Sequence, residues 1–337
     1  SAGSEIGLTT AEMQTQSTFI DAGWDFENIW VMNGYPKFKK DIEIIKVSSW
    51  TELQAMSNNR DGHYVLTRDL LTTDDDYEDV AGPSANGGLG WETIRNFIGI
   101  FDGQNNVIDG LTINRVNEDN IGVFSSSSSL TFIKNIKFQN LSINGRRYVG
   151  GLFGQLTNGG TITGVYIEGI ISGEHMVGGI AGAKGGGDVL ISNVAVKGTV
   201  AANNGSQSGG IIGSGSGGIL DLVNSYTACS VTSSGYYAGG LVGYSYSSGI
   251  INIANSYAVG EISANEYSGG LLGGHQNTVT LTSSFFDVET TGQIESYGRG
   301  DDLTGVVGLI TAEMQDQTTF ESAGWDFENI WVMDGYP

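Results

Sequence analysis

A pentapeptide of the form Gly-Gly-hydrophobic-hydrophobic-Gly occurs five times in this chain, and this repeat constrains the fold more than any other feature. The copies begin at Gly150, Gly178, Gly209, Gly239 and Gly269, at steps of 28, 31, 30 and 30 residues. Self-similarity at this period indicates a solenoid, in which each coil buries its apolar face by stacking on its neighbours. We therefore predict an all-β, parallel and right-handed β-helix with coils of about 30 residues and short capping helices.

Alignment of the five copies on their Gly-Gly pairs predicts three columns of side chains that stack in successive coils. The first is made of asparagines, the second lies two residues later and is mostly aromatic, and the third is aliphatic. Their members are Asn193, Asn224 and Asn255; Tyr166, Ala195, Tyr226, Tyr257 and Phe286; and Ile171, Val200, Val231 and Ile262. We expect the asparagines to form amide ladders between coils and the apolar columns to point inward.

The paired glycines should lie at corners of the coil. There the chain bends sharply or takes positive φ, and a Cβ would crowd the coil above. The single cysteine, Cys229, falls in a column with Gly169, Gly198 and Gly260, which places it at a predicted corner. With one cysteine, no intrachain disulfide can form.

A second repeat relates the two ends of the chain. Residues 10–36 return at 311–337 with a constant offset of 301. We infer one complete unit preceded by the tail of another, either cut from a longer tandem array or joining head to tail. The predicted organisation is a tail from 1–36, a cap and first coils from 37–120, the repeat β-helix from 121–309, and the second tail copy from 310–337.

Both tail copies concentrate large aromatic side chains, which often dominate the energetics of interfaces. These candidate contact residues are Trp24, Phe26, Trp30 and Tyr35, and Trp325, Phe327, Trp331 and Tyr336. In one alternative a tail packs on the first coils of the next unit and covers the sheet edge exposed there. In the other, each tail folds back along its own solenoid.

Charge and hydropathy exclude two classes of partner. The formal net charge is −22, with 15 basic residues, so neither nucleic acid nor an anionic membrane surface is an expected partner. No stretch of about 18 apolar residues occurs, so we expect no membrane insertion of this segment. The expected partners are copies of the chain or adjacent repeats, with surface glycans as an alternative.

The region before the repeats contains an expected short helix at 50–56 that caps the solenoid, followed by an expected protruding loop at 72–90. An acidic run in this loop could collect calcium. Its members are Asp74, Asp75, Asp76, Glu78 and Asp79. The run lacks the alternation and glycine of an EF-hand loop, so a solvated acidic loop is the favoured interpretation, and we expect no cofactor.

Residues 42–337 resemble the GLUG-motif repeat family of bacterial and archaeal cell-surface proteins. The resemblance combines the Gly-Gly repeats with the segments Leu53-Gln54-Ala55-Met56, Phe101-Asp102-Gly103, Gly122-Val123-Phe124, Asn224-Ser225-Tyr226 and Gly324-Trp325-Asp326-Phe327. It implies a β-solenoid within a large secreted or adhesin-like protein, without catalytic activity. Some members of the family carry a metallopeptidase domain, but no His-Glu-x-x-His occurs here, so that activity is not carried over.

The leading hypothesis is a noncatalytic extracellular structural protein, a unit of a surface adhesin or of a head-to-tail filament. A second hypothesis is a glycan-binding module that uses the tyrosines Tyr236, Tyr237, Tyr244, Tyr246 and Tyr267. A third is a polysaccharide-degrading enzyme, which would need two carboxylates across one groove. The acids of the repeats share no column, and the three histidines lie far apart in the sequence.

Overall fold

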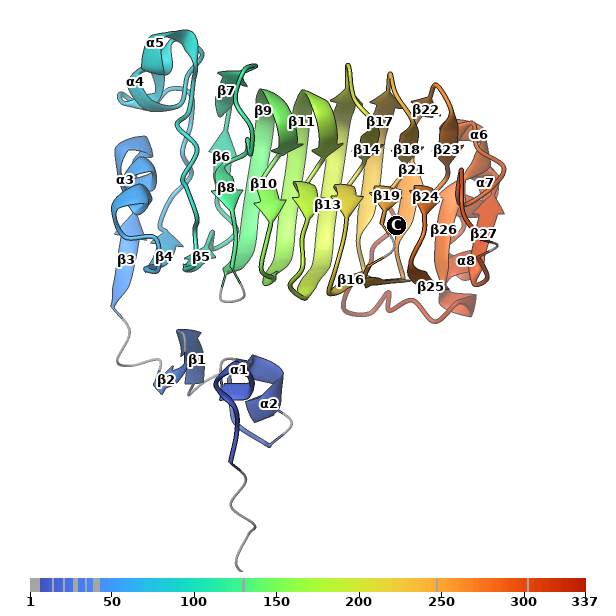
Figure 1. Ribbon diagram of the computed structural model, residues 1–337, viewed down its shortest axis with the longest axis horizontal. Coiled ribbons are helices and arrows are strands. Elements are labelled where there is room, and N and C mark those ends of the chain that lie inside the picture. The colour runs from blue at the N-terminus through green and yellow to red at the C-terminus, as the bar shows by residue number, and fades with distance from the viewer. Residues whose placement is uncertain are drawn as a thin grey trace, which may run out of the picture.

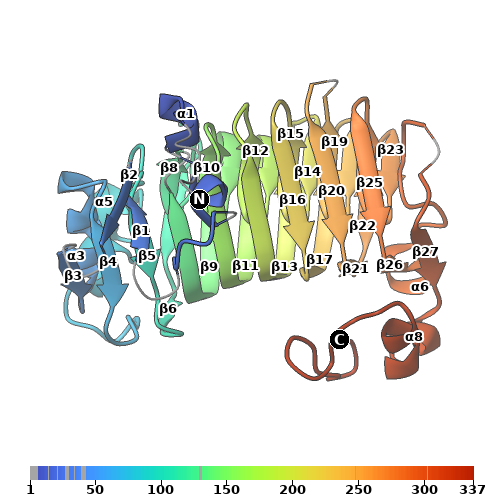
Figure 2. The same cartoon turned by 90° about the horizontal axis from the view of Figure 1, so that it is seen from below.

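The protein forms a parallel β-solenoid, seen from two sides in Figures 1 and 2. The computed structural model describes residues 7–13, 15–20, 22–26, 30–33, 35–38, 43–128, 131–246, 248–301 and 303–337. One face is a six-stranded parallel sheet with one strand from each coil, and each strand after the first begins within a Gly-Gly pentapeptide. These strands are β8 (Phe124–Ser126), β10 (Phe153–Leu156), β12 (Ala181–Lys184), β15 (Ile212–Gly215), β19 (Val242–Ser245) and β24 (Leu272–His275). The predicted all-β parallel solenoid is confirmed.

The rest of each coil is nearly continuous strand in the early coils and is divided into shorter strands later. The early strands are β9 (Phe132–Gly150), β11 (Gly160–Gly178) and β13 (Val189–Ala202). The later strands are β14 (Gln207–Gly209), β16 (Ile219–Val223), β17 (Tyr226–Ser233), β18 (Tyr237–Gly239), β20 (Ile250–Ala254), β21 (Tyr257–Val259), β22 (Ile262–Ala264), β23 (Tyr267–Gly269), β25 (Thr278–Thr282), β26 (Ser284–Asp287) and β27 (Val306–Leu309). All of these strands pair in parallel with those of adjacent coils.

The core is built of apolar columns that run along the solenoid. The predicted aliphatic column is confirmed, because its four residues are paired in register and each is at most 3% exposed. A second column stacks in the same way; its members are Ile133, Ile162, Ile191, Leu222, Ile253 and Leu281. Cys229 pairs with Gly198 as predicted and is buried, and burial raises the pKa of its thiol to about 12.

The second glycine of each pair lies at a bend, one of the two conformations expected there, and positive φ does not occur at these pairs. The pairs leave space for the neighbouring coil. A Cβ on Gly179 would lie 2.2 Å from the carbonyl oxygen of Gly210, and one on Gly210 would lie 2.1 Å from that of Gly240. The left-handed backbone occurs instead in the asparagine column, where φ is 53° at Asn193 and 48° at Asn224. Asparagine tolerates this conformation better than other residues with a Cβ.

The asparagine column stacks as predicted, and one ladder bond is present in it. The Nδ2 of Asn255 donates to the Oδ1 of Asn224 at 3.3 Å. One residue further along, serines form a buried ladder that the sequence analysis did not identify. The amide of Ser225 donates to the Oγ of Ser256, and the amide of Ser256 to the Oγ of Ser284, at 3.2 and 3.4 Å.

The prediction for the aromatic column was wrong in two respects. Its last member is Phe285, which pairs with Tyr257, whereas Phe286 points into the core. The number of residues after each pentapeptide varies, and a slip of one residue moves a side chain to the opposite face of a strand. The column also faces outward, because Tyr166 lies between the buried Val165 and Ile167 of β11.

Short helices cover the N-terminal end of the solenoid, as predicted. Helix α3 (Trp50–Ala55) buries Trp50 and Leu53 beside the strands β3 (Ile44–Val47), β4 (His63–Leu66), β5 (Ile100–Asp102), β6 (Val107–Asp109) and β7 (Thr112–Arg115), and is followed by η2 (Met56–Asn58). The predicted loop at 72–90 is instead a folded segment with α4 (Tyr77–Val80) and α5 (Ala85–Gly88). It buries Tyr77, Ala81 and Ala85.

The two tail copies share a pair of short helices, but the hairpin of the first copy is reduced in the second to one antiparallel bridge between Asp334 and Tyr336. Helices α1 (Thr10–Met13) and α2 (Gln16–Ile20) precede the hairpin of β1 (Trp30–Asn33) and β2 (Tyr35–Phe38). After α6 (Val288–Thr291), the second copy contains α7 (Thr311–Met314) and α8 (Gln317–Ser322). In Figure 1 the first copy is set apart from the coils, whereas the second lies along them. None of the described helices is long and apolar enough to cross a membrane.

Candidate functional site

The outward-facing aromatic column is the most distinctive surface of the solenoid. We call Tyr166, Tyr226, Tyr257 and Phe285 the outer aromatic column; Ala195 interrupts it between the first two. The rings of Tyr226 and Tyr257 are stacked, with centroids 5.0 Å apart and planes within 3°. Because Lys197 lies 5.9 Å from the Tyr226 ring centroid, a cation borders the open end of this stack.

The second tail copy, residues 310–337, covers the other end of the column; we call it the C-terminal module. Its side chains Phe320, Trp325 and Trp331 form a small apolar core with Tyr257 and Phe285, separate from the core inside the solenoid. The Phe320 and Phe285 ring centroids are 5.2 Å apart. Trp325 is 4% exposed as a result, so the module is held by apolar burial.

Hydrogen bonds fix the position of the module on the coils. The indole of Trp325 donates to the carbonyl oxygen of Ser283 at 2.9 Å, and the Ser283 hydroxyl donates to the carbonyl oxygen of Ala323 at 2.9 Å. The hydroxyl of Tyr257 donates to the carbonyl oxygen of Pro337. We call the surface formed by Tyr257, Ser283, Phe285 and Asp287 the docking face.

Asp287 is the polar centre of the docking face and is fully buried. Its Oδ2 accepts hydrogen bonds from the hydroxyls of Thr311 and Tyr336 at 2.8 and 2.7 Å. Its Oδ1 accepts bonds from the amides of Glu289 and Thr290, at the start of α6. Burial, reinforced by Asp287, raises the pKa of Tyr336. One carboxylate therefore joins the last coil, α6 and the module.

The predicted contact residues of the C-terminal copy thus follow the second alternative of the sequence analysis. Trp325, Trp331 and Tyr336 pack back along their own solenoid. Phe327 lies at the margin of the same cluster, with its ring 6.5 Å from that of Phe320. The sequence identified these residues but gave no signal for the face they cover.

We call the first tail copy, residues 9–36, the N-terminal module; the aromatic rings of its described residues are spaced as in the C-terminal module. Its Phe19 and Trp24 rings are 4.9 Å apart, against 4.8 Å for Phe320 and Trp325. Phe26 lies 6.3 Å from Phe19, and Trp30 lies 4.3 Å from Trp24. Trp24 is 38% exposed and Tyr35 is 46% exposed. The described aromatic clusters of the two modules are therefore alike but differ in what covers them.

A groove of about 510 Å³ runs between the C-terminal module and the coils. Tyr226, Lys197 and Asn193 line its solenoid side, and Trp331 and Asp334 line its module side. This groove places ring faces beside amide, ammonium and carboxylate groups.

The tyrosines of the glycan-binding hypothesis lie together at one edge of the solenoid. Tyr237 is 4.2 Å from Tyr244 and 5.3 Å from Tyr267, ring to ring, and Tyr244 is 4.9 Å from Tyr246. Tyr236 is 6.2 Å from Tyr237 and is 51% exposed.

Two further polar residues join these tyrosines, and the sequence analysis did not identify them. The guanidinium of Arg299 donates to the Tyr237 hydroxyl at 3.0 Å, and the Nε2 of Gln207 donates to the Tyr246 hydroxyl at 2.9 Å. Arg299 is distant in sequence and reaches the cluster only through the fold.

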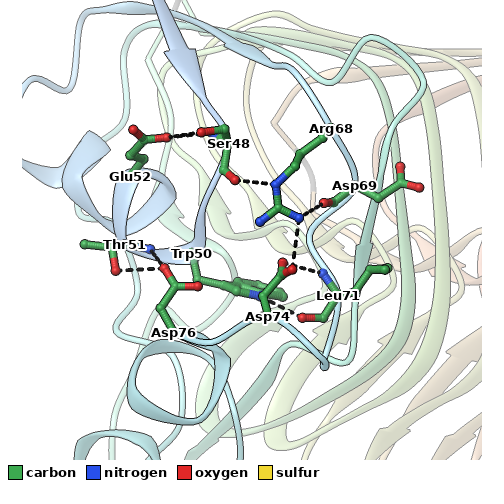
Figure 3. Close-up of polar contacts among 9 residues, drawn as sticks. All are labelled: Ser48, Trp50, Thr51, Glu52, Arg68, Asp69, Leu71, Asp74 and Asp76. Carbon is green, nitrogen blue, oxygen red and sulfur yellow. Dashed lines mark hydrogen bonds and ion pairs between the residues drawn. The ribbon is translucent and has the colours of Figure 1, made fainter.

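Two members of the acidic run of the cap, Asp74 and Asp76, bond to different partners (Figure 3). Asp74 pairs with Arg68 at 2.9 Å and accepts from the amide of Leu71, while Asp76 accepts from the amide and hydroxyl of Thr51. These bonds tie the segment to the helix α3 and the chain after β4. No group of three or more His, Cys, Asp or Glu side chains suited to a metal ion occurs among the described residues.

A polar groove of about 680 Å³ near the cap contains the carboxylates Glu92, Glu118 and Asp119. Glu118 pairs with Arg115 at 2.9 Å, and Asp119 pairs with Arg146 at 2.8 Å. The hydrogen bond from Arg146 lowers the pKa of Asp119. Because a general acid in glycoside hydrolysis needs a raised pKa, this arrangement does not favour that chemistry at Asp119.

The known proteins to which this chain is similar in sequence are much longer than the chain itself. No protein-family model matches the sequence. The chain is 35% identical over 151 residues to Halomucin of Haloquadratum walsbyi, covering 42% of this chain and 2% of that protein. It is 26% identical over 163 residues to an immunoglobulin A1 protease of Streptococcus sanguinis, covering 48% of this chain and 8% of that protein.

A shorter match, 45% identical over 60 residues, is to a protein of Evansella cellulosilytica provisionally named a Gly-rich membrane protein; it covers 17% of this chain and 6% of that protein. The chain thus spans less than a tenth of the length of each of these relatives. A crystal structure from Bacteroides ovatus, provisionally named an immunoglobulin A1 protease, has a TM-score of 0.64 and 21% identity. The match covers 89% of this chain and 92% of that chain, and it shows the fold alone.

Proposed function

We propose that this chain is a noncatalytic structural unit of a large secreted or cell-surface protein, a β-solenoid of GLUG type that holds other parts of that protein away from the surface. The observation that carries the proposal is a module repeated 301 residues apart, with the same Phe–Trp ring pair in both copies. A module that recurs at a fixed interval, once before and once after a solenoid, is typical of a tandem array.

Two further observations support a role outside the cell. The relatives are much longer proteins, and they include Halomucin, a Gly-rich membrane protein and an immunoglobulin A1 protease. The net charge of −22 keeps such chains dispersed by mutual repulsion. Parallel coils distribute a pulling force over many backbone hydrogen bonds, which suits a load-bearing spacer.

Antibody labelling of the source cells tests the location. We expect an antibody against this chain to label intact cells or their medium, and labelling that requires permeabilised cells would overturn the proposal. A second test incubates the chain with immunoglobulin A1 and with a panel of acidic and neutral polysaccharides. We expect no cleavage of either class, and turnover lost in a single carboxylate variant would establish an enzyme instead.

The tyrosine cluster favours one second candidate, a glycan-binding surface within the same structural unit. Tyr236 and Tyr246 are its exposed members, at 51% and 38%, and stacking on a sugar ring uses such side chains. A glycan array tests this. Binding that disappears in Tyr236→Ala and Tyr246→Ala, but survives Ile250→Ala at another exposed position, would support it.

A further inference from the structure

The N-terminal module carries the full set of side chains by which the C-terminal module binds the docking face. The residues of the C-terminal module that make these contacts are Thr311, Phe320, Trp325, Trp331, Tyr336 and Pro337. Subtracting 301 from each number gives the same residue type in the N-terminal module, from Thr10 to Pro36. Each ring contact and each hydrogen bond therefore has a potential equivalent.

The differences between the modules fall away from these contacts. Of the 28 aligned positions, six differ, namely Thr9, Thr15, Ser17, Ile20, Asp21 and Asn33 against Ile310, Asp316, Thr318, Glu321, Ser322 and Asp334. The hydrogen bonds described between the C-terminal module and the docking face come from Thr311, Ala323, Trp325, Tyr336 and Pro337. None of these five residues differs between the copies.

The N-terminal module also holds Phe19 and its two tryptophans as the C-terminal module holds the equivalent residues. The ring centroids of Trp24 and Trp30 are 4.3 Å apart, and those of Trp325 and Trp331 are 4.4 Å apart. The amide of Trp24 donates to the carbonyl oxygen of Phe19 at 2.9 Å, as that of Trp325 does to Phe320 at 3.0 Å. Such preorganisation lowers the entropic cost of binding.

The exposure of the two modules differs in the way expected for a docked and an undocked copy. Trp24 is 38% exposed whereas Trp325 is 4% exposed. Removing this aromatic surface from water would stabilise a complex in proportion to the apolar area buried. The charges are compatible as well, because the Asp287 carboxylate accepts from hydroxyl groups, which Thr10 and Tyr35 also carry.

We propose that the N-terminal module is a second ligand for the docking face and binds the outer aromatic column of another copy of this chain. The inference deepens the proposed structural role, because it names the partner surface through which one unit recognises another. In a single chain the C-terminal module occupies its own docking face, so the N-terminal module binds only a face from which that module has been displaced. The two modules are interchangeable occupants of one surface.

A sequence replacement tests the interchange within one full chain. The variant I310T, D316T, T318S, E321I, S322D and D334N gives the C-terminal module the sequence of the N-terminal one. We expect its tryptophan emission and melting temperature to stay within about 3 °C of the parent, since each difference lies outside the docking contacts. A shift of tryptophan emission to longer wavelength, which reports exposure to water, would overturn the proposal, as would protease cleavage confined to 310–337. Neither result would bear on the proposed location at the cell surface.

A displacement experiment tests binding between copies. In the full chain, Trp325→Ala with Trp331→Ala weakens the resident module, and we expect the mass by light scattering to rise with concentration from 35.5 kDa to a multiple of it. Adding Trp24→Ala and Trp30→Ala should restore the single-chain mass. A weakened variant with intact β circular dichroism that stays at single-chain mass would overturn the proposal. If that variant unfolds, light scattering of the full chain with the milder substitution Trp325→Phe, with and without Trp24→Ala, decides the question, and a mass that stays at 35.5 kDa at every concentration would overturn the proposal.

Discussion

The indole nitrogen of Trp325 donates a 2.9 Å hydrogen bond to the carbonyl oxygen of Ser283, which lies 42 residues earlier in the chain. Ser283 occupies the asparagine column of the last coil and has a φ of 44°. The corner of the last coil is therefore also the anchor of the C-terminal module. The end of the solenoid and the tail that follows it form one structural unit.

Trp325→Phe should loosen the module without unfolding the coils. The change removes one hydrogen bond, worth about 1 kcal/mol, and part of the buried ring. We expect amide exchange in residues 310–337, measured by mass spectrometry, to become at least about fivefold faster. Trp24→Phe is the matched control and should leave exchange in that segment unchanged. Equal effects of the two substitutions would contradict the assignment of the docking face.

Gly210→Ala should destabilise the whole solenoid. The new Cβ would lie 2.1 Å from the carbonyl oxygen of Gly240, a backbone atom that cannot move without shifting the next coil. We expect a loss of more than about 3 kcal/mol in the free energy of unfolding, measured by urea denaturation. Gly186→Ala is the control, since no atom outside its immediate neighbours lies within 4 Å of the added Cβ. A mild effect at Gly210 would contradict the close stacking of the glycine corners.

Substitutions at Asn224 should separate backbone conformation from the amide ladder. Its φ is 48°, so Asn224→Ala should cost about 1 to 2 kcal/mol through left-handed strain. Asn224→Gly removes the strain together with the bond from Asn255 and should cost less than Asn224→Ala. Thermal denaturation of the two variants gives this order, and the reverse order would mean that the ladder dominates.

Lys184 should make the stability of the protein depend on pH. Burial lowers the pKa of Lys184 to about 8, from an ordinary value of 10.5. Between these values the unfolded chain binds the proton and the folded chain does not, so stability rises as the pH increases from about 8 toward 10. Urea midpoints at pH 7.5, 8.5 and 9.5 measure this slope. Lys184→Met should flatten it, and an unchanged slope would assign it to other groups.

The sequence predicted the parts of the fold that repeat and missed those that depend on contacts between distant segments. The column from Ile171 to Ile262 follows directly from the period, whereas the period places Phe286 in the aromatic column in place of Phe285 because the last coil is shorter. The alternation of Val165, Tyr166 and Ile167 indicates that the aromatic column faces outward, but stacking of large rings in a column equally favours a core position. Tyr77 is buried by contacts with distant residues, and the sequence around it has no apolar periodicity that would predict this.

The docking face could not be predicted because it is assembled from two successive coils and is covered by a third segment. Tyr257 and Asp287 meet Trp325 only when the last coil and the tail are both in place. Their sequence neighbourhoods contain no signal for the side of the solenoid on which the tail packs. The internal repeat did identify the module itself.

The most direct test of the account is electron cryomicroscopy of a chain lengthened by one further 301-residue unit after Pro337. We expect the module between the two solenoids to lie on the outer aromatic column of the solenoid that precedes it, with its tryptophans against Tyr257 and Phe285 as in the present structure. A middle module packed on the first coils of the following solenoid would contradict the account.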